Sequence, residues 1–249
     1  MLIAAIAAQV AGPDYALACG LILYVLGFAH GAGDEQDGEL RRFGALHVAG
    51  YLVVGAAIAA LFLAAPLAGL VLFLALSAWH FARSDCAFSA TSRLAIAALA
   101  TGGSALFQRR ETTAIFEQIT AGSVPSELVV AFSVAGGVGV ALAILALVRG
   151  ESGSGHAVLS LGAVALFDPV LAVGLIFVLA HAVPVQQRQI ASYGVPAIMR
   201  AVALPTGIAI AGAATIVALV ANGLLAMEIA VALAFGMATP HMLTERLER

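Results

Sequence analysis

The sequence carries very little charge. Asp, Glu, Lys and Arg together make up only 10% of its 249 residues, whereas a soluble domain carries about a quarter. Lysine is absent, so all eleven basic residues are arginines. A chain with so few charged side chains cannot cover its surface in water, which excludes a soluble globular protein.

Cysteines are also few, and no segment alternates regularly between apolar and polar residues. Cys19 and Cys86 have no framework spacing, so we expect no disulfide. The missing alternation argues against a transmembrane barrel, whose strands alternate over about ten residues. The first residues, MLIAAIAAQVAG, contain no basic side chain. They predict a short or frayed first helix and not a cleaved signal peptide.

Hydrophobic residues are what the sequence has in abundance. They make up 62% of the chain, and the mean hydropathy is +1.06. In lipid a backbone must satisfy its own hydrogen bonds, so long apolar runs predict helices. We predict an all-α fold, a polytopic integral membrane helix bundle of about eight to nine helices, several of them short or broken. Charges, prolines and glycines place these helices at residues 15–30, 43–65, 67–83, 91–107, 128–148, 156–167, 170–182, 198–221 and 224–243.

The chain shows no repeat and no separable part, so we expect a single transmembrane domain over residues 1–249. If the helices alternate in direction, the arginines sort strongly between the two membrane faces. Arg109 and Arg110 fall on one face and the other nine on the opposite face. The positive-inside rule then makes the arginine-rich face cytoplasmic and predicts a multi-pass protein of the bacterial inner membrane.

Four of the six histidines fall at the C-terminal ends of alternate predicted helices: His30, His80, His181 and His241. A single histidine there is commonly a cap, favoured by the helix dipole. Four imidazoles at one depth are harder to explain in this way, because ionisable groups within spans are costly and usually functional. Imidazole is a frequent ligand of Fe, Cu and Zn. The set predicts a metal site near the cytoplasmic face.

Carboxylates follow the first of these histidines in the stretch GFAHGAGDEQDGEL. Asp34 or Glu35, about one helical turn beyond His30, is placed to accept the second ring N–H of a metal-bound imidazole. Asp37 and Glu39 are expected to be solvated loop charges. The roles of His47 and of Glu228, which falls inside the predicted helix 224–243, stay open.

At these residues the sequence resembles the Brp/Blh family of bacterial and archaeal membrane β-carotene 15,15′-dioxygenases. The family motif His-Gly-x-x-Asp is matched by His30, Gly31 and Asp34, and Ser-x-x-His-Phe by Ser77, His80 and Phe81. A later histidine after an apolar helix is matched by His181, and a closing Pro-His-Met-Leu motif by residues 240–243. The order and spacing of the four motifs agree over nearly the whole chain.

This chain departs from the family pattern at two positions. The family usually has a histidine directly after the Asp of the first motif, where Glu35 stands here. It also tends to pair the third-motif histidine with a second one, one turn on, where this chain has Val185. The resemblance implies that both paired histidines bind iron. Val185 therefore removes one expected ligand, which His241 would have to replace.

The resemblance implies a non-haem Fe(2+) enzyme that cleaves the central double bond of β-carotene with O2 to give retinal. Its catalytic and metal-binding residues would be His30, His80, His181 and His241. An enzyme in the lipid bilayer can draw β-carotene, or a related apolar polyene, laterally from the membrane; we expect no nucleic-acid partner. The large apolar residues near these histidines are candidates for substrate binding, although each is equally explained by helix packing: Phe28, Trp79, Phe81, Phe177, Phe235 and Met237.

Three alternative functions stay open. The first is a haem protein of electron transfer, with histidine pairs as axial ligands. The second is a transporter in which buried histidines and Glu228 relay protons or ions, and the third is a relative that binds carotenoid or retinal without cleaving it.

Overall fold

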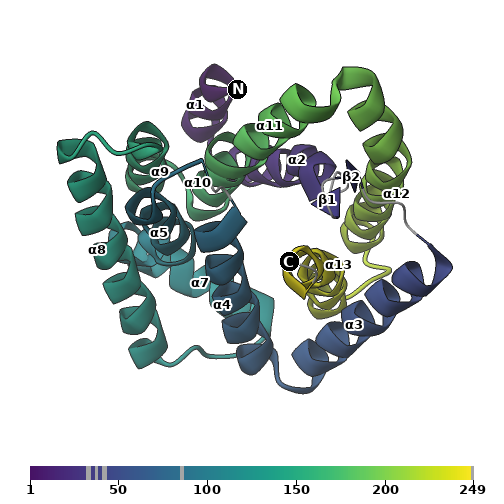
Figure 1. Cartoon of the computed structure of the whole chain (residues 1–249). Helices are drawn as coiled ribbons and strands as arrows, with labels where there is room; N and C mark the ends of the chain where they lie inside the picture. Colours follow the sequence, from purple (N-terminus) through teal and green to yellow (C-terminus); the bar gives the residue numbers. More distant parts are fainter. Residues whose placement is uncertain (32–34, 37–38, 41–43, 85–86, 248–249) are drawn as a thin grey trace. The chain divides into compact units, whose positions relative to one another are not determined.

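The computed structural model is all-α, which confirms the predicted fold class (Figure 1). It describes residues 1–31, 35–36, 39–40, 44–84 and 87–247. Of residues 28–31, 35–36, 39–40, 47, 84 and 244–247 it describes the backbone alone. Two strands of two residues each, β1 (Glu35–Gln36) and β2 (Glu39–Leu40), pair in antiparallel orientation between α2 and α3.

The described residues form eleven continuous helical runs, two of which contain a π-helix. In chain order they are α1 (Leu2–Ala11), α2 (Pro13–Gly31), α3 (Ala45–Ala64), α4 (Pro66–Ser84), α5–η1–α6 (Ala90–Ala98, Leu99–Gly103, Ser104–Phe107), α7 (Arg109–Thr120), α8 (Ser126–Val148), α9 (Ser154–Leu166), α10–η2–α11 (Pro169–Ile176, Phe177–Ala182, Val183–Tyr193), α12 (Val195–Ala221) and α13 (Met227–Leu247).

The nine predicted helices all occur, with two additions and two corrected boundaries. The short first helix expected at the N-terminus is α1, whereas α7 was not predicted because its sequence, RRETTAIFEQIT, is polar. The helix predicted to end at Ala182 continues through Pro184 to Tyr193. The last helix begins at Met227, so Glu228 lies in its first turn and not near its middle.

Four of the described helices are long and apolar enough to cross a membrane: Pro66–Arg83, Ser126–Val148, Pro169–Tyr193 and Val195–Ala221. Two other apolar helices are short: α1 has 10 residues and α9 has 13. Short helices, as expected from the sequence, are therefore present. The chain is a membrane protein.

The contacts divide the chain into two compact units. Unit 1 comprises Met1–Gly27, Ser77–Glu117 and Ser123–Val185, and unit 2 comprises Phe28–Leu76, Gln118–Gly122 and Gln186–Arg249. Each unit is described here by itself.

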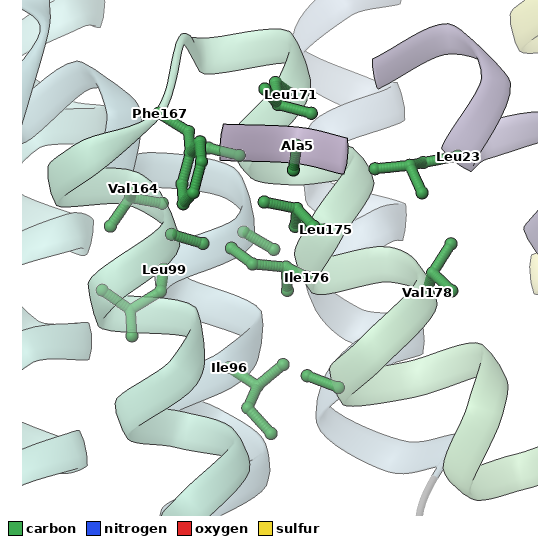
Figure 2. Close-up of a cluster of buried hydrophobic side chains, with 14 of the residues drawn as sticks. Ala5, Leu23, Ile96, Leu99, Val164, Phe167, Leu171, Leu175, Ile176 and Val178 are labelled. Atoms are coloured by element: carbon green, nitrogen blue, oxygen red, sulfur yellow. The ribbon is translucent and has the colours of Figure 1, made fainter. Parts of the chain in front are cut away.

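The core of unit 1 is a continuous apolar cluster from α1, α2, α5, η1, α8, α9, α10 and η2 (Figure 2). Leu99, Val164, Leu171 and Ile176 are completely buried in it. Much of the remainder is alanine, whose small side chain allows helix backbones to approach closely. Membrane helices associate through such packing because lipid offers little hydrophobic driving force between them.

The contact between η1 and α8 depends on two facing glycines. A Cβ atom at Gly102 would lie 2.7 Å from the backbone nitrogen of Gly136, and one at Gly136 would lie 2.8 Å from the carbonyl carbon of Gly102. Neither backbone atom can move aside easily. The Ser133 hydroxyl, on α8, donates to the carbonyl of Ala105, on α6, at 2.7 Å and stabilises the contact between α8 and the run α5–η1–α6.

Helix α2 crosses α10 just as closely. A Cβ at Gly20 would lie 2.9 Å from the backbone of Val170 and Leu171, and one at Gly174 would lie 2.9 Å from the Gly20 carbonyl oxygen. Leu23, one turn further along α2, is buried in the unit 1 core. Gly20, Leu23 and Gly27 follow the i, i+3, i+7 spacing of one helix face, so this face of α2 lies against α10–η2.

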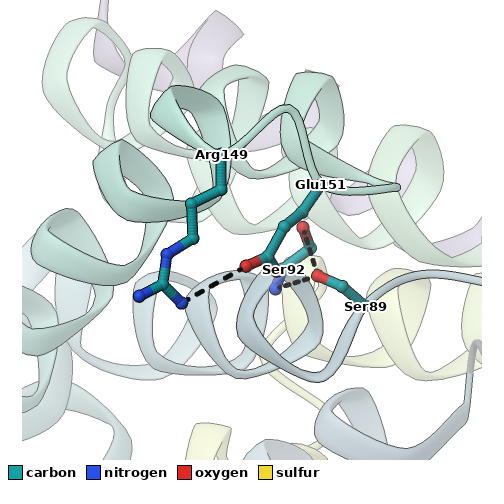
Figure 3. Close-up of polar contacts among 4 residues, drawn as sticks. All are labelled: Ser89, Ser92, Arg149 and Glu151. Atoms are coloured by element: carbon teal, nitrogen blue, oxygen red, sulfur yellow. Dashed lines mark hydrogen bonds and ion pairs between the residues drawn. The ribbon is translucent and has the colours of Figure 1, made fainter.

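The turn between α8 and α9 lies beside the start of α5 (Figure 3), where the Ser89 backbone N–H donates to the Ser152 carbonyl at 3.0 Å. Ser89 caps α5 by accepting a hydrogen bond from the Ser92 backbone N–H at 3.1 Å. Glu151 lies 3.7 Å from Arg149. Hydrogen bonds from the Ser89 and Thr91 side chains, and then the Arg149 charge, hold the pKa of the Glu151 carboxyl below its usual value.

Unit 2 is built on α3 and α13, which lie side by side. A Cβ at Gly55 or at Gly236 would lie 2.6 Å from the carbonyl oxygen of the other residue. The Tyr51 hydroxyl donates to the Met237 carbonyl at 3.0 Å along the same contact.

Candidate functional site

Two of the four predicted histidine ligands meet inside unit 1. The Nε2 atoms of His80 and His181 lie 3.1 Å apart, although the residues are 101 positions apart in the sequence. Their ring centroids are 4.8 Å apart and the ring planes are inclined by 73°. His80 is 4% exposed and His181 is 2% exposed. Each ring therefore directs its own Nε2 atom toward the same buried point.

One of the two helices that carry this pair is irregular where the pair forms. His80 lies one turn before the end of α4, but His181 lies within the π-helix η2, near the middle of the 25-residue run Pro169–Tyr193. The prediction that His181 ends its helix is thus wrong, and so is its explanation as a C-cap. Single π-helical turns inside α-helices are rare and often occur at functional sites.

Pro184 explains why the sequence suggested a helix end. Proline lacks a backbone N–H, and its ring clashes with the preceding turn of an α-helix. In this chain the preceding turn is π-helical, with the Val183 N–H bonded to the Val178 carbonyl. This wider turn accommodates the proline ring, and α11 continues without a break. Val185 consequently lies one turn beyond His181 on continuous helix.

Two phenylalanines form the walls around the His181 ring. Phe177 lies nearly parallel to it, at 24° with 5.9 Å between centroids. Phe81 meets it edge to face, at 71° and 4.8 Å. Tyr24 in turn stacks on the Phe177 ring, with 5.6 Å between the ring centroids. The imidazole pair is therefore surrounded by apolar ring surface.

The spacing of the two Nε2 atoms fits a hydrogen bond between the rings and also fits the binding of one metal ion by both rings. Without a cation, one ring donates its N–H to the other. With a cation, both rings present lone pairs, and imidazole nitrogens bind a divalent metal such as zinc at about 2.0–2.1 Å. Two such nitrogens on adjacent coordination positions stand about 3 Å apart, as they do here, whereas two on opposite positions stand about 4 Å apart. The pair fits adjacent ligands of one metal ion and does not fit the two axial ligands of a haem.

The residues of the first motif cannot be placed relative to this pair from the described side chains. His30 is the second-to-last residue of α2, but its side chain, like those of Phe28 and Glu35, lies outside the described residues, and so does Asp34 altogether. Within the side chains that the structure does describe, no group of three or more His, Cys, Asp or Glu residues is placed to hold a metal ion.

His241 lies in unit 2, within α13 and not at its end, so its explanation as a C-cap is also wrong. Phe235 packs in the same unit, stacked on Phe73 at 3.9 Å and edge to face with Phe62 at 5.1 Å. Met237 is 40% exposed. Ordinary packing within unit 2 therefore explains the position of Phe235.

The remaining predicted residues are placed as follows. Trp79 is 36% exposed and lies beside His80 in the chain. Glu228, in the first turn of α13, is at the helix end where the dipole favours a carboxylate. That position accounts for Glu228 without a relay role. His47 is in the first turn of α3, and its side chain lies outside the described residues.

Sequence reasoning missed Tyr24 and Gly27. A Cβ at Gly27 would lie 2.7 Å from Cδ1 and 2.9 Å from Cζ of Phe177, so the phenyl ring rests directly on the Gly27 backbone. The signal that would have found this contact is the Gly20, Leu23, Gly27 face of α2.

Comparison with known proteins identifies the family of the chain. No curated protein and no solved structure matches the chain. A family model described as β-carotene 15,15′-dioxygenase matches residues 21–247, a range that includes all four histidines of the predicted site. The chain therefore belongs to the β-carotene 15,15′-dioxygenase family.

Proposed function

We propose that this membrane protein is an iron-dependent oxygenase that cleaves the central double bond of β-carotene with O2. One O2 molecule would supply one oxygen atom to each of the two retinal molecules formed. The observation that carries the proposal is the buried His80–His181 pair, whose nitrogens lie 3.1 Å apart in a chain that matches the family over residues 21–247.

The ligand set that we propose is His30, His80, His181 and His241. His80 and His181 are supported by their geometry, whereas His30 and His241 are proposed from their sequence motifs. Asp34 or Glu35 would orient the His30 ring by accepting its second N–H. Bound by neutral imidazoles, Fe(2+) would supply redox chemistry and open coordination positions for O2.

The described residues contribute an apolar environment. Phe81 and Phe177 cover the His181 ring, and the low exposure of both histidines keeps water away from the site. Exclusion of water protects reactive intermediates from side reactions. The polyene would enter laterally from the lipid and contact large apolar side chains close to the ligands. The candidates remain Phe28, Trp79, Phe81, Phe177, Phe235 and Met237.

A second candidate function is binding of a carotenoid or retinal without cleavage. Val185 favours it, because this residue stands on continuous helix one turn beyond His181, where the family pattern has a second histidine. A site that lacks this ligand would bind iron less tightly and yet keep its apolar walls.

The proposal is tested by expressing the chain in a bacterium that accumulates β-carotene. We expect retinal to form at the expense of β-carotene, and the purified protein to hold about one iron per chain. His80→Ala and His181→Ala should each deplete the iron and abolish turnover, whereas Glu228→Gln, a first-turn carboxylate of α13 that is not in the proposed ligand set, should change neither. Co-purification of intact pigment with no retinal would favour the binding function. A Soret band in the visible spectrum would refute both.

We also propose that the Arg83 end of α4, which follows His80, faces the cytoplasm across the inner membrane, because nine of the eleven arginines sort to that face. Reporter fusions after Arg83 and after Arg249 should read as cytoplasmic. A periplasmic reading at both would reverse the orientation.

A further inference from the structure

We propose that Phe177, resting on the bare backbone of Gly27, is a positioning residue that sets the plane of the His181 imidazole. The proposal rests on the proposed role of His181 as a metal ligand and deepens it. It assigns Phe177 to the geometry of the site and Gly27 to the support of Phe177.

The first step concerns the freedom of the imidazole. Rotation about the Cβ–Cγ bond of histidine has a broad energy profile, so the backbone alone does not determine the ring plane. A ligand must nevertheless hold its lone pair within about 10–20° of the productive direction. The plane of His181 has to be set by the side chains packed against it.

The second step identifies those side chains. Phe177 and His181 are four residues apart, on the same side of the run α10–η2–α11, and their rings are inclined by only 24°. Phe81 closes the edge of the imidazole at 71° and meets Phe177 at 89°, with 6.4 Å between the phenyl centroids. The imidazole therefore contacts one nearly parallel and one steeply inclined phenyl ring, and the two phenyl rings also contact each other.

The third step concerns what holds Phe177 in place. On one side its ring stacks with Tyr24 at 29° and 5.6 Å. At its edge it touches the α2 backbone at Gly27, where a methyl group would come within 3 Å of three ring carbons. Carbon atoms that are not bonded normally stay about 3.5–4.0 Å apart. Any residue other than glycine would therefore displace the ring from this position and change its orientation relative to His181.

The experiment measures Co(2+) binding to the purified full-length chain, with the position of the cobalt visible bands as a second readout that reports ligand geometry. We expect Gly27→Ala to weaken Co(2+) binding about tenfold or more, the typical effect of losing an orienting partner of a ligand, and to shift the bands. Phe177→Leu should do the same, because leucine offers no parallel ring. Gly162→Ala is the matched control, since a Cβ at that helical glycine of α9 meets no atom within 4 Å.

The double variant Gly27→Ala with Phe177→Leu separates positioning from general damage. Once the ring is absent, the added methyl group has nothing to displace, so Gly27→Ala should have almost no further effect in that background. Additive losses, or unchanged binding and bands in both single variants, would overturn the proposal. If Gly27→Ala does not fold, Phe177→Leu alone decides by the same readouts. Wild-type protein that binds no Co(2+) would instead overturn the proposed metal site.

Discussion

The replacement Val185→His tests the metal site most directly, because Val185 lies one turn beyond His181 on the same continuous helix. His181 and Val185 are four residues apart on a helix that Pro184 does not interrupt. Side chains at this spacing lie about 5–6 Å apart at Cβ and share one face. Val185 is half-buried, in the same unit as the histidine pair. A histidine there would present a third imidazole to the point where the two Nε2 atoms meet.

The expected gain follows from the value of pre-positioned ligands. Removing a partner that only orients a ligand typically lowers metal affinity about 10–100-fold. A direct ligand should therefore raise the iron affinity at least about tenfold, which corresponds to about 1.4 kcal/mol. Val185→Leu adds apolar volume without a donor and serves as the control for overpacking. Only Val185→His should bind iron more tightly than the wild type.

The assay is iron bound per chain and retinal formed per bound iron, in matched preparations of the three proteins. We expect both quantities to rise in Val185→His and to stay level or fall in Val185→Leu. Equal or greater iron binding and turnover in the wild type would refute the reasoning. That result would mean that His241 already completes the site and that Val185 is part of the apolar wall.

Three further predictions follow from the structure. Gly136→Ala should destabilise the protein by about 1–3 kcal/mol in thermal unfolding, because a Cβ there meets the Gly102 backbone. At the adjacent Gly137 a Cβ meets nothing within 4 Å, so Gly137→Ala should be neutral or stabilising by up to about 1 kcal/mol. Equal effects of the two substitutions would contradict the packing of Gly136 on Gly102. The pKa of Glu151 is lowered by hydrogen bonds from Ser89 and Thr91. Its contribution to stability should therefore be complete at pH values above its usual pKa of 4.5 and disappear as the pH falls through the lowered pKa. The melting temperature of Glu151→Gln should lack this part of the acid dependence, and the same dependence of melting temperature on pH as in the wild type would argue against these contacts. His241→Ala should deplete iron if His241 is a ligand, and full iron with full turnover would exclude it from the site.

The sequence by itself determined the class of protein and the residues to examine. With 10% charged residues and 62% hydrophobic residues, the chain has no alternative to lipid-embedded helices. Helix boundaries at charges and prolines were also readable, since these residues interrupt apolar runs. The exceptions are instructive: α7 is too polar to be recognised as a helix from its composition, and Pro184 marks a helix end by every local rule.

Only the tertiary structure decided how the candidate site is arranged. A π-helical turn depends on what packs around it, so no local pattern predicts that η2 carries the chain past Pro184 and places His181 mid-helix. The approach of His80 to His181 joins residues 101 positions apart. The position of Phe177, the parallel neighbour of His181, likewise depends on a contact with the α2 backbone at Gly27. Sequence spacing shows which histidines are present, but their separation and ring planes are set by contacts between helices that are distant in the chain.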